Sequence, residues 1–364
     1  MKKIRILSLD GGGIRGILSG TILTYLEDQI KKKTGNPDSS IGEYFDLIAG
    51  TSTGGILGLV YICPDDNGNY LFSAREALDI YLEKGDDIFD VNFSKKIESL
   101  GGVRDEKYTA TELEQTLAAY FGDRKLSEVL KPCLISSYDI HNRKAHFFTS
   151  IEAKSEIYDY YLRDVARATS SAPTYFEPVR INSIYGTPKT LVDGGVFANN
   201  PALCAYAEAR TTEFSKALNT SDKPDFPGAK DMLMISIGTG EILEPYTYKQ
   251  YKNAGVIKWI KPLIDIMMSG NSETVDYQLR QIYKTLSSDD CNDYYRIQPR
   301  LTYANNAMDD GRQSNLKALH EDGLASVEHY KEALDEIVDK LIDNHLPSAG
   351  KMNKDEMEPG DEVG

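Results

Sequence analysis

The stretch that decides the fold is Gly50-Thr51-Ser52-Thr53-Gly54-Gly55. It lies between an apolar segment, 45–49, that we expect to be a strand and an apolar segment, 53–63, that we expect to be a buried helix. The stretch matches the pattern G-x-S-x-G, in which a sharp strand-to-helix turn lifts a serine hydroxyl above the edge of a sheet. The pattern therefore predicts an α/β fold and makes Ser52 a candidate nucleophile.

An earlier junction is also rich in glycine. Asp10-Gly11-Gly12-Gly13-Ile14-Arg15-Gly16 follows a predicted strand, 4–9, and opens a predicted helix. Its glycines fit the dinucleotide pattern G-x-G-x-x-G, but the acidic residue expected at the end of a second strand is missing, because 34–40 is a polar loop. Two interpretations remain open: backbone N–H groups that bind an anion or oxyanion at a helix N-terminus, or a tight turn without a ligand.

A serine nucleophile needs a base. The order Ser52, Asp193, His320 would mimic the triad of an α/β-hydrolase, yet only one strand and one helix precede Ser52, and His320 lies in a predicted amphipathic helix. Asp193 is the better candidate, because an apolar strand delivers its carboxylate to a Gly-Gly turn. Apolar neighbours would raise the pKa of this carboxylate from about 4 toward a value that suits a base.

Strand-like and helix-like segments alternate along most of the chain. Further strands are expected at 132–138, 145–149, 190–192 and 232–237, and the chain becomes mostly helical from 256 onward. Alternation of this kind predicts an α/β layered fold with a largely parallel sheet. We expect one domain over residues 1–346 and an acidic, flexible tail over 347–364.

The segment 256–268 is apolar at helical spacing and contains the only tryptophan of the chain, Trp259. We hypothesise that it borders an acyl pocket or touches a lipid interface; the alternative is packing in the core.

Composition excludes several classes of protein. The 41 basic and 56 acidic residues give a net charge of -15, which argues against nucleic-acid binding and against simple adsorption to anionic membranes. The four cysteines form no C-x-x-C pair, so no zinc or redox motif is expected. No apolar window approaches the length of about 20 residues that a membrane-spanning helix needs, and no signal peptide is recognised. We therefore expect a cytoplasmic protein without metal or cofactor.

Four stretches resemble motifs of the patatin-like phospholipase family, and their layout is close to that of plant patatins. They are the glycine-rich loop 10–16, the elbow 50–55, the run of small residues 168–176, and Asp193-Gly194-Gly195 with Asn199-Asn200-Pro201. The resemblance implies a three-layer α/β/α fold with a mostly parallel central sheet, a helical C-terminal part and a Ser–Asp dyad without histidine. By matching position, Ser52 would be the nucleophile and Asp193 the base. Gly11, Gly12 and Gly13 would supply oxyanion N–H groups, and Arg15 would help to bind the lipid phosphate.

The expected function is that of a serine-dependent lipid acyl hydrolase of the phospholipase A or lysophospholipase type. Its substrate would be a phospholipid or another acyl lipid, met during transient contact with a membrane or micelle. Three alternatives stay open: an acyltransferase on the same dyad, a dinucleotide-binding module, and a lipase effector that a partner or signal molecule switches on.

Overall fold

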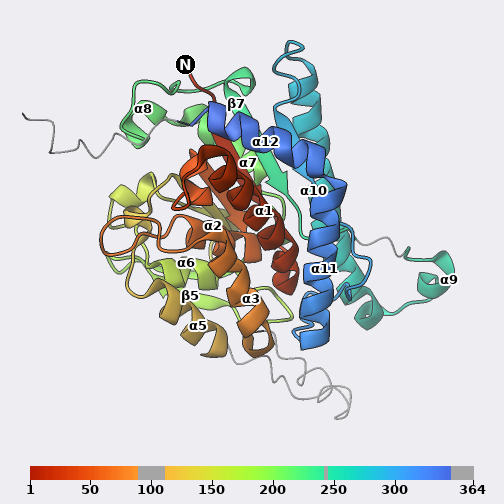
Figure 1. Cartoon of the computed structure of the whole chain (residues 1–364). Coiled ribbons are helices and arrows are strands. Elements are labelled where there is room, and N and C mark those ends of the chain that lie inside the picture. Colours follow the sequence, from red (N-terminus) through yellow and green to blue (C-terminus); the bar gives the residue numbers. More distant parts are fainter. Residues whose placement is uncertain (89–110, 242–244, 346–364) are drawn as a thin grey trace, which may run out of the picture.

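The computed structural model describes residues 1–88, 111–241 and 245–345 (Figure 1). Its strands are β1 (Ile4–Leu9), β2 (Leu47–Thr51), β3 (Cys133–Asp139), β4 (Lys144–Thr149), β5 (Val179–Asn182), β6 (Pro188–Asp193), β7 (Met232–Ile237) and β8 (Tyr294–Ile297). Its helices are α1 (Gly16–Thr34), α2 (Thr53–Tyr61), α3 (Ala74–Ile88), α5 (Thr111–Phe121), α6 (Leu162–Thr169), α7 (Ala202–Thr211), α8 (Phe214–Ala217), α9 (Tyr248–Tyr251), α10 (Val256–Lys284), α11 (Gln313–His329) and α12 (Lys331–Asp343). No helix in the described ranges has the length and apolar character needed to cross a lipid bilayer.

The strands form one sheet in the order β5-β6-β3-β2-β1-β7-β8, and β4 also pairs with β3. The neighbouring pairs β3–β2, β2–β1, β1–β7 and β7–β8 are parallel. The pairs β3–β4, β3–β6 and β6–β5 are antiparallel. The predicted α/β class with a mostly parallel central sheet and C-terminal helices is therefore confirmed.

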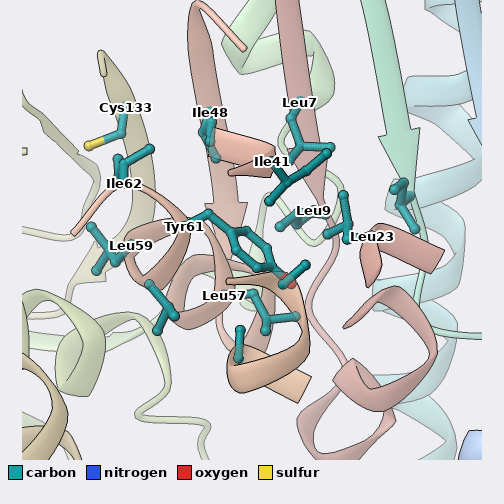
Figure 2. Packing of buried hydrophobic residues seen from close by; sticks show 14 of the residues in the cluster. Leu7, Leu9, Leu23, Ile41, Ile48, Leu57, Leu59, Tyr61, Ile62 and Cys133 are labelled. Carbon is teal, nitrogen blue, oxygen red and sulfur yellow. The ribbon is translucent and has the colours of Figure 1, made fainter. Parts of the chain in front are cut away.

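Helices cover both faces of the sheet, as the alternating side chains of β1 demonstrate. Leu7 and Leu9 join the apolar core beneath α1, α2, α3, α11 and α12 (Figure 2). Ile4 and Ile6 point to the other face and pack with apolar residues of α7 and α10. Because successive strand residues point to opposite faces, β1, which has apolar residues on both faces and is buried throughout, must lie between two layers. The result is three layers, with the sheet in the middle.

Two strands, β5 and β8, are absent from the predictions made from sequence. Each has only four residues and carries an arginine, Arg180 in β5 and Arg296 in β8. Four residues of mixed polarity are too few to display the periodicity that identifies a strand in a sequence. These segments become strands because their backbones pair with a neighbouring strand, β5 with β6 and β8 with β7. The predicted tail, 347–364, lies outside the described residues.

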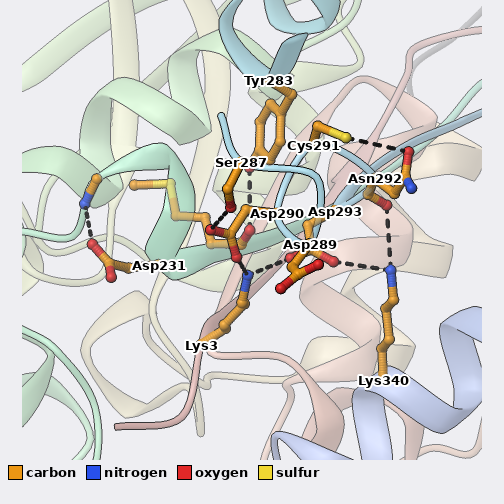
Figure 3. A network of polar contacts seen from close by, with 12 residues as sticks. Lys3, Asp231, Tyr283, Ser287, Asp289, Asp290, Cys291, Asn292, Asp293 and Lys340 are labelled. Carbon is orange, nitrogen blue, oxygen red and sulfur yellow. Dashed lines mark hydrogen bonds and ion pairs between the residues drawn. The ribbon is translucent and has the colours of Figure 1, made fainter. Parts of the chain in front are cut away.

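A polar network fixes the start of β8. Lys3 at the N-terminus donates to Asp290 at 2.6 Å and also to Asp293, and Lys340 of α12 donates to Asp293 at 3.0 Å (Figure 3). Asp293 directly precedes β8, so the first strand, the loop before β8 and the last helix are joined at one point. This network positions β8, the strand that carries Arg296.

Candidate active site

The chain makes a sharp turn at Ser52, between β2 and α2. Ser52 has a φ of 54°, which residues other than glycine rarely adopt. Glycine is required on both sides of it. A Cβ atom on Gly50 would lie 2.3 Å from the carbonyl oxygen of Gly54, and one on Gly54 would lie 2.3 Å from that of Leu9. The turn places the Ser52 side chain on the wall of a cavity.

Strand β6 brings Asp193 to Ser52 because β2 and β6 share one edge of β3. Because β4 pairs along the other edge of β3, β2 and β6 must share the remaining edge. β2 pairs with the first half of β3 and β6 with the second half. Thr51 pairs with Ser136, and Asp193 pairs with the next residue, Ser137. The carboxyl ends of the two strands therefore meet, and the Ser52 hydroxyl donates a hydrogen bond to the Asp193 carboxylate.

Burial sets the proton affinity of Asp193. It raises the pKa of this carboxyl from 3.8 to about 6, and the hydrogen bonds from Ser52 and from the Gly195 N–H reverse part of the shift. The Gly195 N–H donates to Oδ1 at 2.7 Å and fixes the orientation of the carboxylate. At neutral pH the group is mostly ionised, yet it is a stronger base than an exposed aspartate.

The run of small residues supports both side chains. The Thr169 hydroxyl accepts the Ser52 N–H at 2.8 Å and donates to the carbonyl oxygen of Ser136 at 2.7 Å. The carbonyl oxygen of Ser171 accepts the Asp193 N–H at 3.0 Å. Residues of this run thus hold the backbone at Ser52 and at Asp193 together.

The glycine-rich loop presents fewer free N–H groups than the sequence suggested. The Gly11 N–H donates to the carbonyl oxygen of Asn199 at 3.1 Å, so it is not available to an oxyanion. Within the described ranges, the N–H groups of Gly12 and Gly13 have no acceptor, and both residues line the same cavity as Ser52. Gly13 has a φ of 59°, which turns the backbone here into the helix that follows.

Arg296, which belongs to no motif recognised in the sequence, holds this loop. Its guanidinium donates two hydrogen bonds to the Asp10 carboxylate, at 2.9 and 2.6 Å, and the two side chains are only 7% and 3% exposed. It also donates to Ser236 at 2.8 Å and to Gln298 at 2.7 Å. Asp10 opens the glycine-rich loop, so β8 anchors the loop through an ion pair. No local pattern could have indicated the pairing, because the two residues lie 286 positions apart.

Arg15 is buried, with 5% of its surface exposed. Burial lowers the pKa of its guanidinium; Nε donates to the carbonyl oxygen of Gly12 at 3.4 Å, and Nη1 has no partner among the described residues. Arg15 lines a polar cavity of about 650 Å³. Asn199 lines it too, and its Oδ1 atom is also buried without a partner. Each of these two residues on the cavity wall therefore carries one buried polar atom without a partner among the described residues.

The cavity at Ser52 is different in character. It measures about 110 Å³ and is walled mainly by apolar side chains, among them Phe176, Ile264, Met267 and Met268. The last three belong to α10, so the predicted segment 256–268 does border the cavity. Met268 lines the polar cavity as well, and the two spaces therefore adjoin.

The five histidines lie elsewhere, all in the described ranges, and none lines the cavity at Ser52. His320 of α11 contacts the Thr21 hydroxyl at 3.1 Å. His146 is half-buried, and this partial burial lowers the pKa of its ring to about 4. The hypothetical order Ser52, Asp193, His320 therefore does not form a triad.

Fold and site together define a class of protein. It is a three-layer α/β protein in which a serine at a strand-to-helix elbow meets a buried carboxylate beside a glycine-rich loop. Residues 7–206 match the model of the family described as patatin-like phospholipase, and the chain belongs to that family.

Curated relatives match this chain over most of their own length. Patatin-like protein 2 of Arabidopsis thaliana is 36% identical over 343 residues, which cover 88% of this chain and 82% of the relative. Patatin group J-1 of Solanum tuberosum is 33% identical over 361 residues, covering 94% and 90%. Patatin-like protein 1 of Oryza sativa subsp. indica is 31% identical over 337 residues, covering 87% and 80%. Family membership implies a lipid acyl hydrolase.

Proposed function

We propose that the protein hydrolyses fatty-acyl esters of lipids, as an enzyme of the phospholipase A or lysophospholipase type, with Ser52 as nucleophile and Asp193 as base. The observation that carries the proposal is the hydrogen bond from the Ser52 hydroxyl to a buried carboxylate whose pKa is about 6. A serine hydroxyl is a weak nucleophile until a neighbouring base accepts its proton.

The reaction would proceed in two halves. Ser52 Oγ attacks the ester carbonyl carbon while its proton passes to Asp193. Collapse of the tetrahedral intermediate breaks the bond to the alcohol, which leaves with that proton, and an acyl-serine remains. Water then attacks the acyl-serine, Asp193 takes a proton from the water, and the proton returns to Ser52 as the fatty acid leaves.

Gly12 and Gly13 are the proposed donors to the oxyanion. Their N–H groups have no acceptor within the described ranges and their residues line the cavity beside Ser52. Preorganised donors of this kind stabilise charge that develops only in the transition state. Gly11, whose N–H already binds Asn199, is left out of this role.

We assign the two adjoining cavities to the two parts of the lipid. The apolar cavity suits the acyl chain, and the polar one suits the phosphate or another polar part, with Arg15 Nη1 as donor and Asn199 Oδ1 as acceptor. Burying these polar atoms without a partner costs free energy, and a ligand that binds both removes the cost.

We also propose that the enzyme works in the cytoplasm. All four cysteines are free, as suits a reducing compartment.

Labelling with a fluorophosphonate tests the nucleophile. Such a probe phosphonylates an activated serine, so peptide mapping should place the label on Ser52. Ser52→Ala should remove both label and activity, and Asp193→Asn should lower kcat by about 10³-fold or more, by analogy with the loss of a triad member.

Ser170 provides the matched control. It lines the same cavity, but its hydroxyl donates to the carbonyl oxygen of Ala166 at 2.8 Å. Ser170→Ala should keep the label on Ser52. Label on Ser170, or full activity in folded Ser52→Ala protein, would refute the proposal.

A further inference from the structure

The first half of α10 turns an apolar face to solvent. Its large apolar side chains are exposed, Val256 at 82%, Leu263 at 52% and Trp259 at 37%. The face is made of Val256, Trp259, Ile260, Leu263, Ile266 and Met267. Each of these residues has another member of the set three or four positions away, so they share one side of the helix. We call this set the α10 apolar face; its exposure contradicts the alternative that this side of the segment packs in the core.

Scattered exposed apolar residues are ordinary, but this set is contiguous. Tyr246 and Tyr248 extend it from the neighbouring α9 and the loop before it, and both are exposed. Tyr251 joins the two helices, since its ring centroid lies 4.9 Å from that of Trp259. Figure 1 shows α9 projecting from the body of the molecule beside α10. Aromatic residues that gather at one projecting edge are typical of proteins that meet a membrane interface.

The charge around the face has the opposite sign to that of the chain. Residues 245–268 contain four lysines and one acidic residue, Asp265, whereas the whole chain has a net charge of -15. Lys249, Lys252 and Lys258 are exposed and form no ion pair with any described residue. Ammonium groups flanking an apolar helix face complement the phosphates at a bilayer surface.

The face is continuous with the cavity at Ser52. Met267 belongs to the exposed face and also lines that cavity, together with Ile264 and Met268 from the same helix. A lipid that met the α10 apolar face would therefore have a short apolar path to Ser52.

We infer that the α10 apolar face, with its flanking lysines, is the surface on which the protein docks onto a phospholipid membrane. The inference deepens the proposed function, because it names the route by which an acyl chain leaves the bilayer for the cavity. Docking itself is a binding event and can be measured without turnover.

Trp259 is the reporter, because it is the only tryptophan in the chain. Ser52→Ala protein is mixed with vesicles of phosphatidylcholine, with and without phosphatidylglycerol, and the Trp259 emission is recorded. Entry into the interface should shift the emission to shorter wavelength. Ile260→Ser/Leu263→Ser in the same protein should lower the vesicle partition coefficient by about tenfold or more.

Leu324→Ser is the matched control, since Leu324 on α11 is exposed to the same extent as Leu263, 52%. It should leave vesicle binding unchanged. In protein with Ser52 intact, Ile260→Ser/Leu263→Ser should hydrolyse a short soluble ester at the normal rate, because neither side chain lines the cavity.

Several outcomes would overturn the inference. The first is an unchanged Trp259 emission with both kinds of vesicle. The second is a dimer that Ile260→Ser/Leu263→Ser converts to a monomer, since the face would then bind a second copy of the chain. The third is equal loss of soluble-ester and vesicle activity. Vesicle binding without any ester hydrolysis would instead refute only the proposed function.

Discussion

Asp193 is a single carboxylate whose environment fixes when it can act as a base. Its pKa of about 6 comes first from burial, and only its ionised form accepts the Ser52 proton. We expect kcat/KM on a soluble ester to fall about tenfold per pH unit below 6 and to reach a plateau above pH 7. A pH–rate profile measures this, with circular dichroism at each pH as the control for folding. An inflection near pH 4, the value of an exposed aspartate, would contradict it.

At this scale, strict local constraints made the elbow predictable from sequence. The φ of Ser52 and the 2.3 Å approaches at Gly50 and Gly54 allow few other residues, so the pattern appears in the sequence. The bond from the Gly11 N–H to Asn199 was not predictable, because its acceptor comes from a distant segment. Local patterns indicate conformation, whereas the partner of a given N–H depends on tertiary packing.

Among the elements, β8 controls the glycine-rich loop through Arg296. Arg296→Gln would leave the buried Asp10 carboxylate without its counter-charge and free the loop to move. We expect kcat to fall by about 10²-fold with little change in KM, since the loop donors act mainly in the transition state. Steady-state kinetics on a soluble ester would measure this.

Arg296→Lys separates positioning from stability. It keeps the charge but cannot donate the two parallel bonds to Asp10, so thermal stability should recover more than kcat does. Wild-type kcat in folded Arg296→Gln would show that β8 does not hold the loop.

Elements defined by their own periodicity were predictable, and elements defined by their neighbours were not. β7 has the predicted bounds because all six of its residues are buried and the only polar one among them is Ser236. β8 has four residues and needs β7 to pair with, so its sequence carries no comparable signal. For α10 the helical spacing was clear, but spacing alone does not tell an apolar face that packs from one that meets solvent.

Across the whole molecule, the two ends of the sheet have different tasks. Ser52 follows β2, whereas Asp46 directly precedes it, six residues earlier and about 20 Å away along an extended strand. Asp46 accepts hydrogen bonds from Arg5 at 2.8 Å and from Lys223 at 2.6 Å, and all three side chains are buried. The cluster joins β1, the start of β2 and the segment before β7, so it supports the sheet far from the site.

Asp46→Asn should therefore affect stability and not catalysis. It leaves two buried cations without their counter-charge, which costs about 3 to 5 kcal/mol and lowers Tm by about 5 °C. The ion pairs lower the pKa of Asp46 below 3.8, so the stabilisation is present above that pH and is lost as the pH falls through the lower folded value. At pH 7 the mutant should be less stable than wild type, and the difference should shrink in acid.

Asp339→Asn, which removes an exposed partner of Lys33, is the control and should shift Tm by less than about 1 °C. Calorimetry gives Tm, and kcat per folded molecule should stay at the wild-type value; a kcat that falls along with Tm would mean that the two ends of the sheet are coupled.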